Sequence, residues 1–166
     1  EYLSGRTPNP CVRCNSYVKW DTFINQADKL GAKYIATGHY ANIEKSNNEY
    51  KITRGKDKGK DQSYVLWGIP KETLSRTILP LGNLRKREVR QIAADNKFEN
   101  AQAPESMEIC FIPDNNYKRF INEYAKDKVE EISKKGTTLN EDGEKIGEND
   151  GFINYTVGQR KGIGIT

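Results

Sequence analysis

The residues of this sequence best suited to chemistry are the two cysteines of Cys11-Val-Arg-Cys14. A C-x-x-C motif fits a redox pair, half of a metal site, or two inert and partly buried thiols. Two prolines in Gly5-Arg-Thr-Pro-Asn-Pro10 predict a rigid loop, so the motif is expected just before a helix. The partial positive charge of a helix N-terminus, with Arg13 nearby, would stabilise a thiolate at Cys14.

Cys110 is the third cysteine and lies in a short apolar run. A cysteine in an apolar strand is usually core, but the polar lead-in Glu105-Ser-Met-Glu108 suggests that one end of the run meets solvent or a site. If Cys110 lies near Cys14, the two thiols could form a transient disulfide, with one carrying a group and the other resolving it. The weaker alternative is a zinc site, whose ligands would be Cys11, Cys14, Cys110 and His39.

Gly38 and His39 form a second candidate site, because they follow Tyr34–Thr37, a predicted buried strand. Ligands bind at the carboxyl ends of strands in open α/β sheets. Gly38 would let a nucleotide approach the backbone closely. Any histidine base must be His39, the one histidine; a surface or internally satisfied histidine is the alternative.

A third candidate is Lys60-Asp61-Gln62-Ser63-Tyr64, which opens a predicted short helix ending at Trp67. Lys60 and the helix N-terminus would bind phosphate, while Gln62 and Tyr64 would contact or stack on a base. A solvated helix start is the alternative.

The charge distribution favours a polyanionic partner for one surface. The formal net charge is only +4, but residues 51–90 hold 11 basic and 4 acidic residues, a net charge of +7. Residues 91–150 hold 8 basic and 14 acidic residues, a net charge of −6. Such a division can steer a nucleic acid to one face, although an uneven solvated surface would look the same.

Composition limits the class of protein. The 166 residues suit one domain with a small second one. The mean hydropathy is −0.86, and no apolar run approaches the roughly 20 residues of a spanning helix, which excludes a membrane protein. An odd number of cysteines and no signal peptide predict a reducing compartment, the cytoplasm.

The elements that must position these residues indicate an α/β protein. A helix capped by Asn15 or Ser16 is predicted to end at Gly31. Its apolar stripe consists of Trp20, Phe23, Ile24, Ala27 and Leu30. Residues 40–44 and 50–54 predict a hairpin, because turn-forming residues separate them.

The second half of the chain is expected to change character near Lys128. Residues 87–96 predict a helix with Val89, Ile92 and Ala93 inward, and Asp114 is expected to cap a helix over 117–124. After Lys128 helical stripes give way to turns, with a hairpin over 137–147. We therefore expect an α/β domain over 1–128 and a small β-rich domain over 129–166.

Together these pieces resemble the tRNA-specific 2-thiouridylase family of the MnmA/TrmU type. Each matching stretch is weakly specific alone, but they occur in the family's order and cover nearly all of the chain. The stretches are Gly5–Asn15, Ala36–Ala41, Lys60–Tyr64, Leu81-Gly82, Ile109–Ile112, Asp150-Gly151 and Tyr155–Gly162.

The resemblance implies a fold and an activity. The fold is the rear half of an adenine-nucleotide-hydrolase-like (PP-loop ATPase) domain followed by a small β-rich central domain. The activity is that of a tRNA uridine 2-sulfurtransferase, which uses ATP with Mg²⁺ to adenylate the 2-carbonyl of the wobble uridine and inserts sulfur from a cysteine persulfide. Its partners would be tRNA and a sulfur-relay or cysteine desulfurase protein in the cytoplasm.

The resemblance also assigns residues by motif. Cys14 matches the nucleophile and Cys110 the persulfide carrier, and sulfur transfer would leave a transient Cys14–Cys110 disulfide. Gly38 matches an ATP-contacting position. The positions that match tRNA contacts are His39, Lys60, Asp61 and Gln62.

The chain departs from the family pattern in several places, one of which is the Ser-Met-Glu before Ile109, a variant of the commoner lead-in. The family's Ser-Gly-Gly-x-Asp-Ser loop and its C-terminal β-barrel are not in this sequence, so we expect the middle of a longer enzyme that is inactive alone. Some relatives have a catalytic Asp at position 11, where this chain has Cys11. Either the carboxylate is dispensable or the thiol replaces it.

Two other functions fit the residues. One is a different ATP-pyrophosphatase-type sulfurtransferase or ligase with the same thiol chemistry. The other is an RNA-binding module with a zinc-binding C-x-x-C motif.

Overall fold

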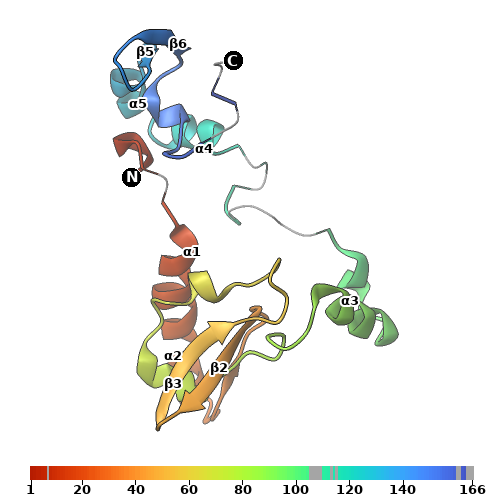
Figure 1. The fold of residues 1–166 in the computed structure, drawn as a ribbon. Helices are drawn as coiled ribbons and strands as arrows, with labels where there is room; N and C mark the ends of the chain where they lie inside the picture. The colour runs from red at the N-terminus through yellow and green to blue at the C-terminus, as the bar shows by residue number, and fades with distance from the viewer. Residues whose placement is uncertain (7, 105–109, 113, 115, 160–161, 164–166) are drawn as a thin grey trace. The chain divides into compact units, whose positions relative to one another are not determined.

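The computed structural model describes residues 1–6, 8–104, 110–112, 114, 116–159 and 162–163. The chain forms two compact units (Figure 1). The larger unit is Pro10–Glu105, and the smaller unit combines Glu1–Asn9 with Ser106–Thr166. These compact units divide between residues 105 and 106, and the domain boundary expected near Lys128 stays a prediction. The polar lead-in to Cys110 lies outside the described residues.

One continuous helical run opens the larger unit. It consists of α1 (Pro10–Arg13), a π-helical segment, η2 (Cys14–Trp20), and α2 (Asp21–Lys29). Proline suits the first position of a helix, because its missing N–H would have no partner there. The helix therefore begins at Pro10 rather than at Asn15 or Ser16. The expectation that the C-x-x-C motif precedes the helix is wrong: both cysteines lie in its first turns.

The apolar stripe of this run is narrower than predicted. Trp20 is fully buried and Ala27 is 5% exposed, but Phe23 is 41% exposed and Leu30 is 81% exposed. Leu30 lies beyond the last helical residue. Gly31, with φ +65°, ends the run as predicted, in the left-handed conformation that glycine adopts without strain.

The strands of the larger unit form two separate pairs (Figure 1). Strand β1 (Ile35–Ala36) pairs in parallel with β4 (Thr77–Ile78). Strands β2 (Ala41–Ser46) and β3 (Glu49–Arg54) form the predicted antiparallel hairpin. Its two turn residues have positive φ, 48° at Asn47 and 64° at Asn48, which asparagine tolerates well.

The remaining elements of the larger unit are short turns and one helix. They are η3 (Ser63–Val65), η4 (Lys71–Arg76), α3 (Lys86–Asp95) and η5 (Glu99–Gln102). The helix predicted over 62–67 is therefore only a 3-10 turn. Helix α3 is confirmed, but none of its residues, all of which the structure describes, is buried. Its apolar side chains do not join the core cluster, which contains Trp20, Ala27, Ile35, Ala41, Val65, Leu66, Ile69 and Leu74.

The smaller unit combines two helices with a hairpin. Its elements are η1 (Tyr2–Ser4), α4 (Tyr117–Tyr124), α5 (Lys126–Ile132), β5 (Gly136–Leu139), β6 (Lys145–Asn149) and η6 (Phe152–Asn154). Helix α4 and the hairpin are confirmed. Helix α5 differs from the prediction. It continues helical structure past Lys128, where the sequence predicts turns. Ile121, Val129 and Ile153 form the core.

The cap of α4 differs from the prediction. Asn116 is the N-cap, and its side-chain oxygen accepts from the N–H of Arg119 at 2.9 Å. Asp114 instead accepts from the N–H of Asn116 at 3.2 Å and pairs with the Arg119 guanidinium at 2.6 Å. That guanidinium lowers the pKa of Asp114 to about 2.

None of the helices in the described part of the chain is long and apolar enough to cross a membrane.

Candidate active site

The C-x-x-C motif lies where the helical run changes from α to π. Cys11 is exposed and Cys14, the first residue of the π-helical segment, is half-buried; both are free thiols. The next residue, Asn15, is only 2% exposed, and its Nδ2 donates to the Val65 carbonyl at 3.2 Å. This bond ties the helix at Cys14 to turn η3. π-Helical turns frequently occur at functional sites.

His39 is held as a neutral imidazole. Its Nδ1 lies 2.9 Å from the Thr37 hydroxyl, and its ring centroid lies 5.6 Å from that of the buried Trp20. Burial, reinforced by the positive charge of Lys19, lowers the pKa of His39 to about 4. Because Thr37 occupies Nδ1, Nε2 is the nitrogen that could contact a ligand.

Gln62 joins the lysine-rich loop, residues 56–60, to the segment that carries His39. Its side-chain oxygen accepts from the N–H of Tyr40 at 3.0 Å, and its own N–H donates to the Tyr40 carbonyl at 2.8 Å. Two residue stretches that the sequence analysis singled out separately, 36–41 and 60–64, thus come together in the larger unit.

Asp61 organises this loop from within. Its carboxylate accepts from the N–H of Gly55 at 2.9 Å and from both the N–H and the hydroxyl of Ser63, at 3.3 and 2.8 Å. Desolvation works against the charged form, but these hydrogen bonds together outweigh it and hold the pKa of Asp61 below its ordinary value. A Cβ on Gly55 would lie 2.7 Å from the Tyr40 carbonyl oxygen, so only glycine fits there.

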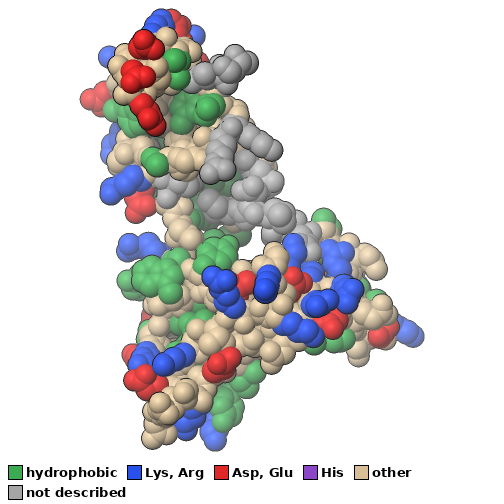
Figure 2. Space-filling model, in the orientation of Figure 1, with side chains coloured by type: hydrophobic (Ala, Val, Ile, Leu, Met, Phe, Trp, Pro, Cys, Tyr) green, Lys and Arg blue, Asp and Glu red, His purple; other side chains and the backbone are tan. Residues whose placement is uncertain are grey.

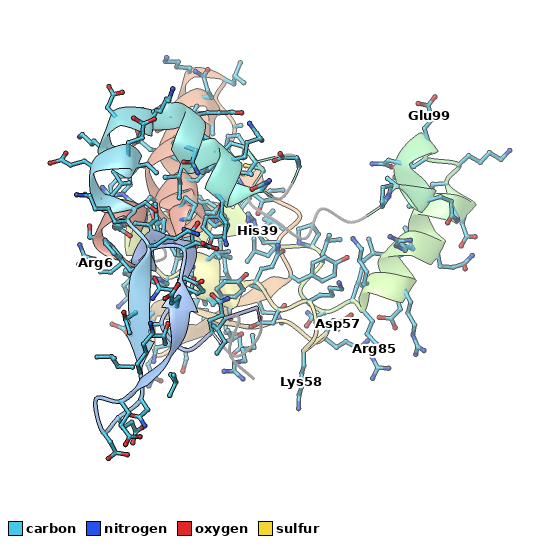
Figure 3. All side chains as sticks on the ribbon, turned by 90° about the horizontal axis from the view of Figure 1, so that it is seen from above. Arg6, His39, Asp57, Lys58, Arg85 and Glu99 are labelled. Atoms are coloured by element: carbon cyan, nitrogen blue, oxygen red, sulfur yellow. The ribbon has the colours of Figure 1, made fainter. Side chains whose placement is uncertain are left out.

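Asp57 is a structural residue that the sequence analysis missed. It accepts from the N–H of Lys86, at the start of α3, at 2.9 Å, and from the N–H of Gly59 at 3.2 Å. The first of these bonds is the main reason that the pKa of Asp57 is lowered. Half-buried Lys60 donates its N–H to the Asp57 carbonyl at 3.0 Å. Figure 3 shows Asp57 and Lys58 beside Arg85 at the base of α3.

The helix whose N-terminus was expected to bind phosphate near Lys60 does not form, because no regular helix begins there. The three-residue turn η3 presents too few aligned N–H groups for such a site. The positive charge of residues 51–90 is nevertheless on the surface. Figure 2 shows Lys and Arg side chains gathered over α3 and the adjoining loop of the larger unit.

Gly38 lies at the carboxyl end of β1, where Thr37 donates its N–H to the Ile78 carbonyl at 3.2 Å. It is exposed, and a Cβ there would meet only Leu81 Cδ1 at 3.6 Å, an ordinary contact. The end of a parallel strand pair is where α/β proteins bind nucleotides, and nothing in the described residues crowds this position. The position is therefore open, and the backbone does not itself require glycine.

Cys110 belongs to the smaller unit and is an exposed free thiol. The reading of this residue as buried core is wrong. Ile112, at 2% exposed, is the member of the apolar run that is buried, and the Phe111 ring contacts that of Phe120 with centroids 5.6 Å apart. These neighbours anchor the run and leave the thiol at the surface.

Within the described residues, no three or more His, Cys, Asp or Glu side chains are placed to hold a metal ion.

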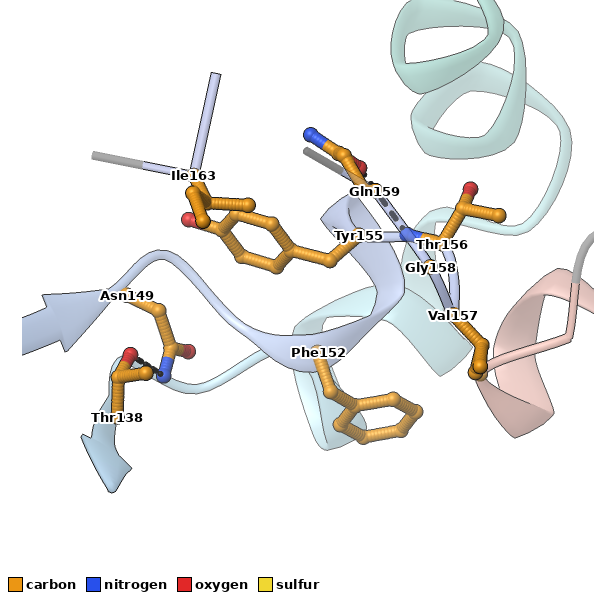
Figure 4. A pocket seen from close by; sticks show the side chains of 10 residues that line it. Thr138, Asn149, Phe152, Tyr155, Thr156, Val157, Gly158, Gln159 and Ile163 are labelled. Carbon is orange, nitrogen blue, oxygen red and sulfur yellow. Dashed lines mark hydrogen bonds between the residues drawn. The ribbon is translucent and has the colours of Figure 1, made fainter. Parts of the chain in front are cut away.

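The smaller unit contains a pocket of about 420 Å³ (Figure 4). Phe152, Tyr155 and Val157 supply much of its apolar wall. Two of its polar side chains bind each other: Asn149 Nδ2 donates to the Thr138 hydroxyl at 3.1 Å. None of the site residues predicted from the sequence lines this pocket.

Comparison with known proteins identifies the class of protein. A family model described as the tRNA methyl transferase HUP domain matches residues 1–114, and one described as the tRNA methyl transferase PRC-barrel domain matches residues 118–166. The chain belongs to the tRNA methyl transferase HUP-domain family. This confirms the predicted order of an α/β, PP-loop-ATPase-like domain followed by a small β-rich one.

Curated relatives narrow the class. The chain is similar to the tRNA-specific 2-thiouridylase MnmA of Amoebophilus asiaticus, with 56% identity over 100% of this chain and 44% of the relative. The MnmA proteins of Salinibacter ruber and Cytophaga hutchinsonii are 51% and 49% identical over 99% and 100% of this chain, and over 44% and 45% of their own lengths. The chain thus spans less than half the length of these relatives. The resemblance to the 2-thiouridylase family is confirmed.

Proposed function

We propose that this chain is part of a tRNA uridine 2-sulfurtransferase. The observation that carries the proposal is the similarity of the whole chain to 2-thiouridylases at 49–56% identity in the three relatives described above. Two features support it: a half-buried thiol at the start of a π-helical segment and a basic surface in the same unit. The substrate would be the wobble uridine of certain tRNAs.

The chemistry would pass one sulfur atom through two cysteines. ATP, with Mg²⁺, would supply the adenylyl group that turns the uridine 2-carbonyl oxygen into a leaving group. The terminal sulfur of a persulfide on Cys110 attacks C2 of the uridine and displaces the activated oxygen, which leaves as part of AMP. The Cys14 thiolate then attacks Cys110 Sγ, and the electron pair of the broken S–S bond stays on the transferred sulfur.

These reaction steps produce 2-thiouridine and a Cys14–Cys110 disulfide. A thiol reductant would supply two electrons and two protons to restore both thiols. The exposure of Cys110 suits a thiol that must be loaded by another protein, a sulfur-relay protein or a cysteine desulfurase. The reducing conditions that such a cycle needs favour a cytoplasmic location.

The tRNA contacts would come from one loop system. Lys60 supplies positive charge, and neutral His39 supplies a hydrogen-bonding nitrogen without a charge of its own. Asp61 and Gln62 already hold the loop and the Tyr40 backbone, so their contribution to tRNA binding would include shaping this surface. Gly38 would lie against ATP.

The proposed domain division, 1–128 and 129–166, places all of these parts in the first domain. The first carries Cys14, Gly38 and the tRNA-contacting loop. It also carries Cys110, which precedes the division.

Mass spectrometry of the full-length protein tests the carrier role. Incubation with a sulfur donor should add about 32 Da, one sulfur atom, to the peptide that contains Cys110. Cys110→Ser should abolish the adduct, whereas Cys14→Ser should keep it and still fail to produce 2-thiouridine. Modification of tRNA by the protein with both substitutions would overturn the proposal.

A further inference from the structure

Two large aromatic side chains are exposed beside the helix that carries Cys14. Tyr64 is 62% exposed and Trp67 is 75% exposed, whereas Val65 and Leu66 between them are buried at 5% and 0%. The segment thus places its aliphatic pair in the core and its aromatic pair in solvent. Burying an aromatic side chain stabilises a protein far more than leaving it in water, so this arrangement needs a reason.

The segment is fastened to the helical run at Cys14. The Val65 carbonyl accepts from Asn15 Nδ2 at 3.2 Å. Gly68, directly after Trp67, packs so closely that a Cβ there would lie 2.6 Å from the Ser16 hydroxyl and 3.3 Å from Val12 Cγ1. Figure 1 draws this segment in yellow beside the red helical run. The two aromatic residues are therefore held next to the part of the helix that contains Cys14.

The helix itself adds a ring and a cation. Tyr17 is 68% exposed, and the Arg13 guanidinium lies over its ring, 5.4 Å from the centroid. Arg13 and Lys19 are both exposed. Exposed aromatic rings interleaved with cations are the features that bind unpaired nucleic-acid bases and their phosphates.

We propose that Tyr64 and Trp67, with the Arg13–Tyr17 pair on the adjoining helix, form a stacking surface for unpaired RNA bases. These bases would flank the nucleotide presented to Cys14. This inference rests on the proposed function for its RNA substrate and adds the residues that hold the single strand. An enzyme that works on a base must take it out of its stack, and rings that stack on its neighbours compensate for that loss.

Tryptophan fluorescence of the full-length protein provides a direct readout. Trp20 is fully buried and Trp67 is the exposed tryptophan of this chain, so acrylamide should quench a component that Trp67→Phe removes. An RNA stem-loop with an unpaired uridine-containing loop should quench the same component. If Trp67 is already shielded before RNA is added, the surface is covered by another part of the protein and the proposal is wrong.

Binding of the same stem-loop gives the second measurement. Trp67→Ala should weaken it on the order of tenfold, and Trp67→Phe should retain most of the affinity, because a phenyl ring still stacks. Tyr34→Ala is the matched control, because Tyr34 is also exposed, at 48%, and also has a cation over its ring, Lys33 at 5.3 Å. Tyr34 directly precedes β1 and is not part of the proposed stacking surface, so its loss should leave stem-loop binding unchanged. A fully paired RNA of equal length should bind all variants alike.

The outcomes separate this inference from the proposed function. Normal thiolation with unchanged stem-loop affinity in Trp67→Ala would overturn the stacking surface alone. Loss of single-strand binding in Trp67→Ala, in a protein that thiolates no tRNA, would support the stacking surface and overturn the sulfurtransferase proposal.

Discussion

Gln62 binds both backbone groups of Tyr40: its side-chain oxygen accepts from the N–H at 3.0 Å, and its N–H donates to the carbonyl at 2.8 Å. Twenty-two residues separate the two in sequence. The pairing fixes the backbone directly after His39 and makes the lysine-rich loop part of the same surface.

Gln62→Ala should therefore destabilise the fold as well as weaken RNA binding. The N–H of Tyr40 would lose its acceptor, which costs about 1 kcal/mol of unfolding free energy. Gln62→Glu keeps an acceptor and should stay near the wild-type value. Urea denaturation of both variants measures the difference. Equal stability of the alanine variant and the wild type would show that the Gln62 side chain has no structural role.

His39 should titrate far below an ordinary histidine. Burial and Lys19 favour the neutral ring, so NMR of the one histidine in this chain should give a pKa of about 4 rather than 6.5. A value near 6.5 would contradict the half-buried, Trp20-packed position.

The same pKa shift predicts how stability changes with pH. Between pH 6.5 and pH 4 the unfolded chain binds a proton at His39 that the folded chain does not, so the unfolding free energy falls as the pH falls through this range. Above pH 6.5 this contribution is constant. His39→Gln removes the titrating group. The stability difference between wild type and variant should therefore change only in the acidic range, which denaturation at several pH values will measure.

Alanine substitution should lower the free energy of unfolding at Gly82 but leave it unchanged at Gly38. A Cβ at Gly82 would lie 2.0 Å from the Ala41 carbonyl oxygen, so Gly82→Ala must push β2 away and should cost roughly 1–3 kcal/mol or more. Gly38→Ala meets only an ordinary contact with Leu81 and should fold normally. If a nucleotide lies against Gly38, the second variant should instead bind ATP more weakly, as equilibrium binding can show. Unchanged stability of Gly82→Ala would contradict the close approach.

The hydroxyl of Thr77 should contribute to the stability of the larger unit. It accepts from the Trp20 indole N–H at 3.0 Å and donates to the Thr73 carbonyl at 2.9 Å. Thr77→Val would leave both groups without this partner in a buried place, at a cost of about 2 kcal/mol. Thr77→Ser keeps both bonds and should lose less. Thermal denaturation of the pair tests this, and an equal loss in both would show that the hydroxyl contributes no more than the methyl group.

Local sequence chemistry predicted the elements whose cause is local. Hairpin β2–β3 was predictable because Asn47 and Asn48 suit its turn, and Gly31 marked the end of α2. The start of the first helix does not follow from the two prolines alone, because proline, which breaks a helix in its interior, is compatible with a first helical position.

The site could be predicted only as separate pieces. The cysteines, Gly38–His39 and the lysine-rich loop were each visible as residue types. The contacts that join them depend on partners far apart in sequence, such as Asp57 with Lys86, or Trp20 with Thr77. No periodicity connects such residues, so only the folded chain reveals them. The exposure of Cys110 could not be predicted from its apolar neighbours either, because it depends on which of them pack against residues far away in the sequence.

The seven-residue π-helical segment links the buried Trp20 to the half-buried Cys14. A π-helix has more residues per turn than an α-helix, so it rotates through less than roughly 100° per residue. The segment therefore sets the direction in which the Cys14 side chain leaves the helix axis, measured relative to the fixed indole of Trp20. Inserting or deleting one residue here would swing the thiol to another side of the cylinder while moving it along the axis by little more than an atom's width.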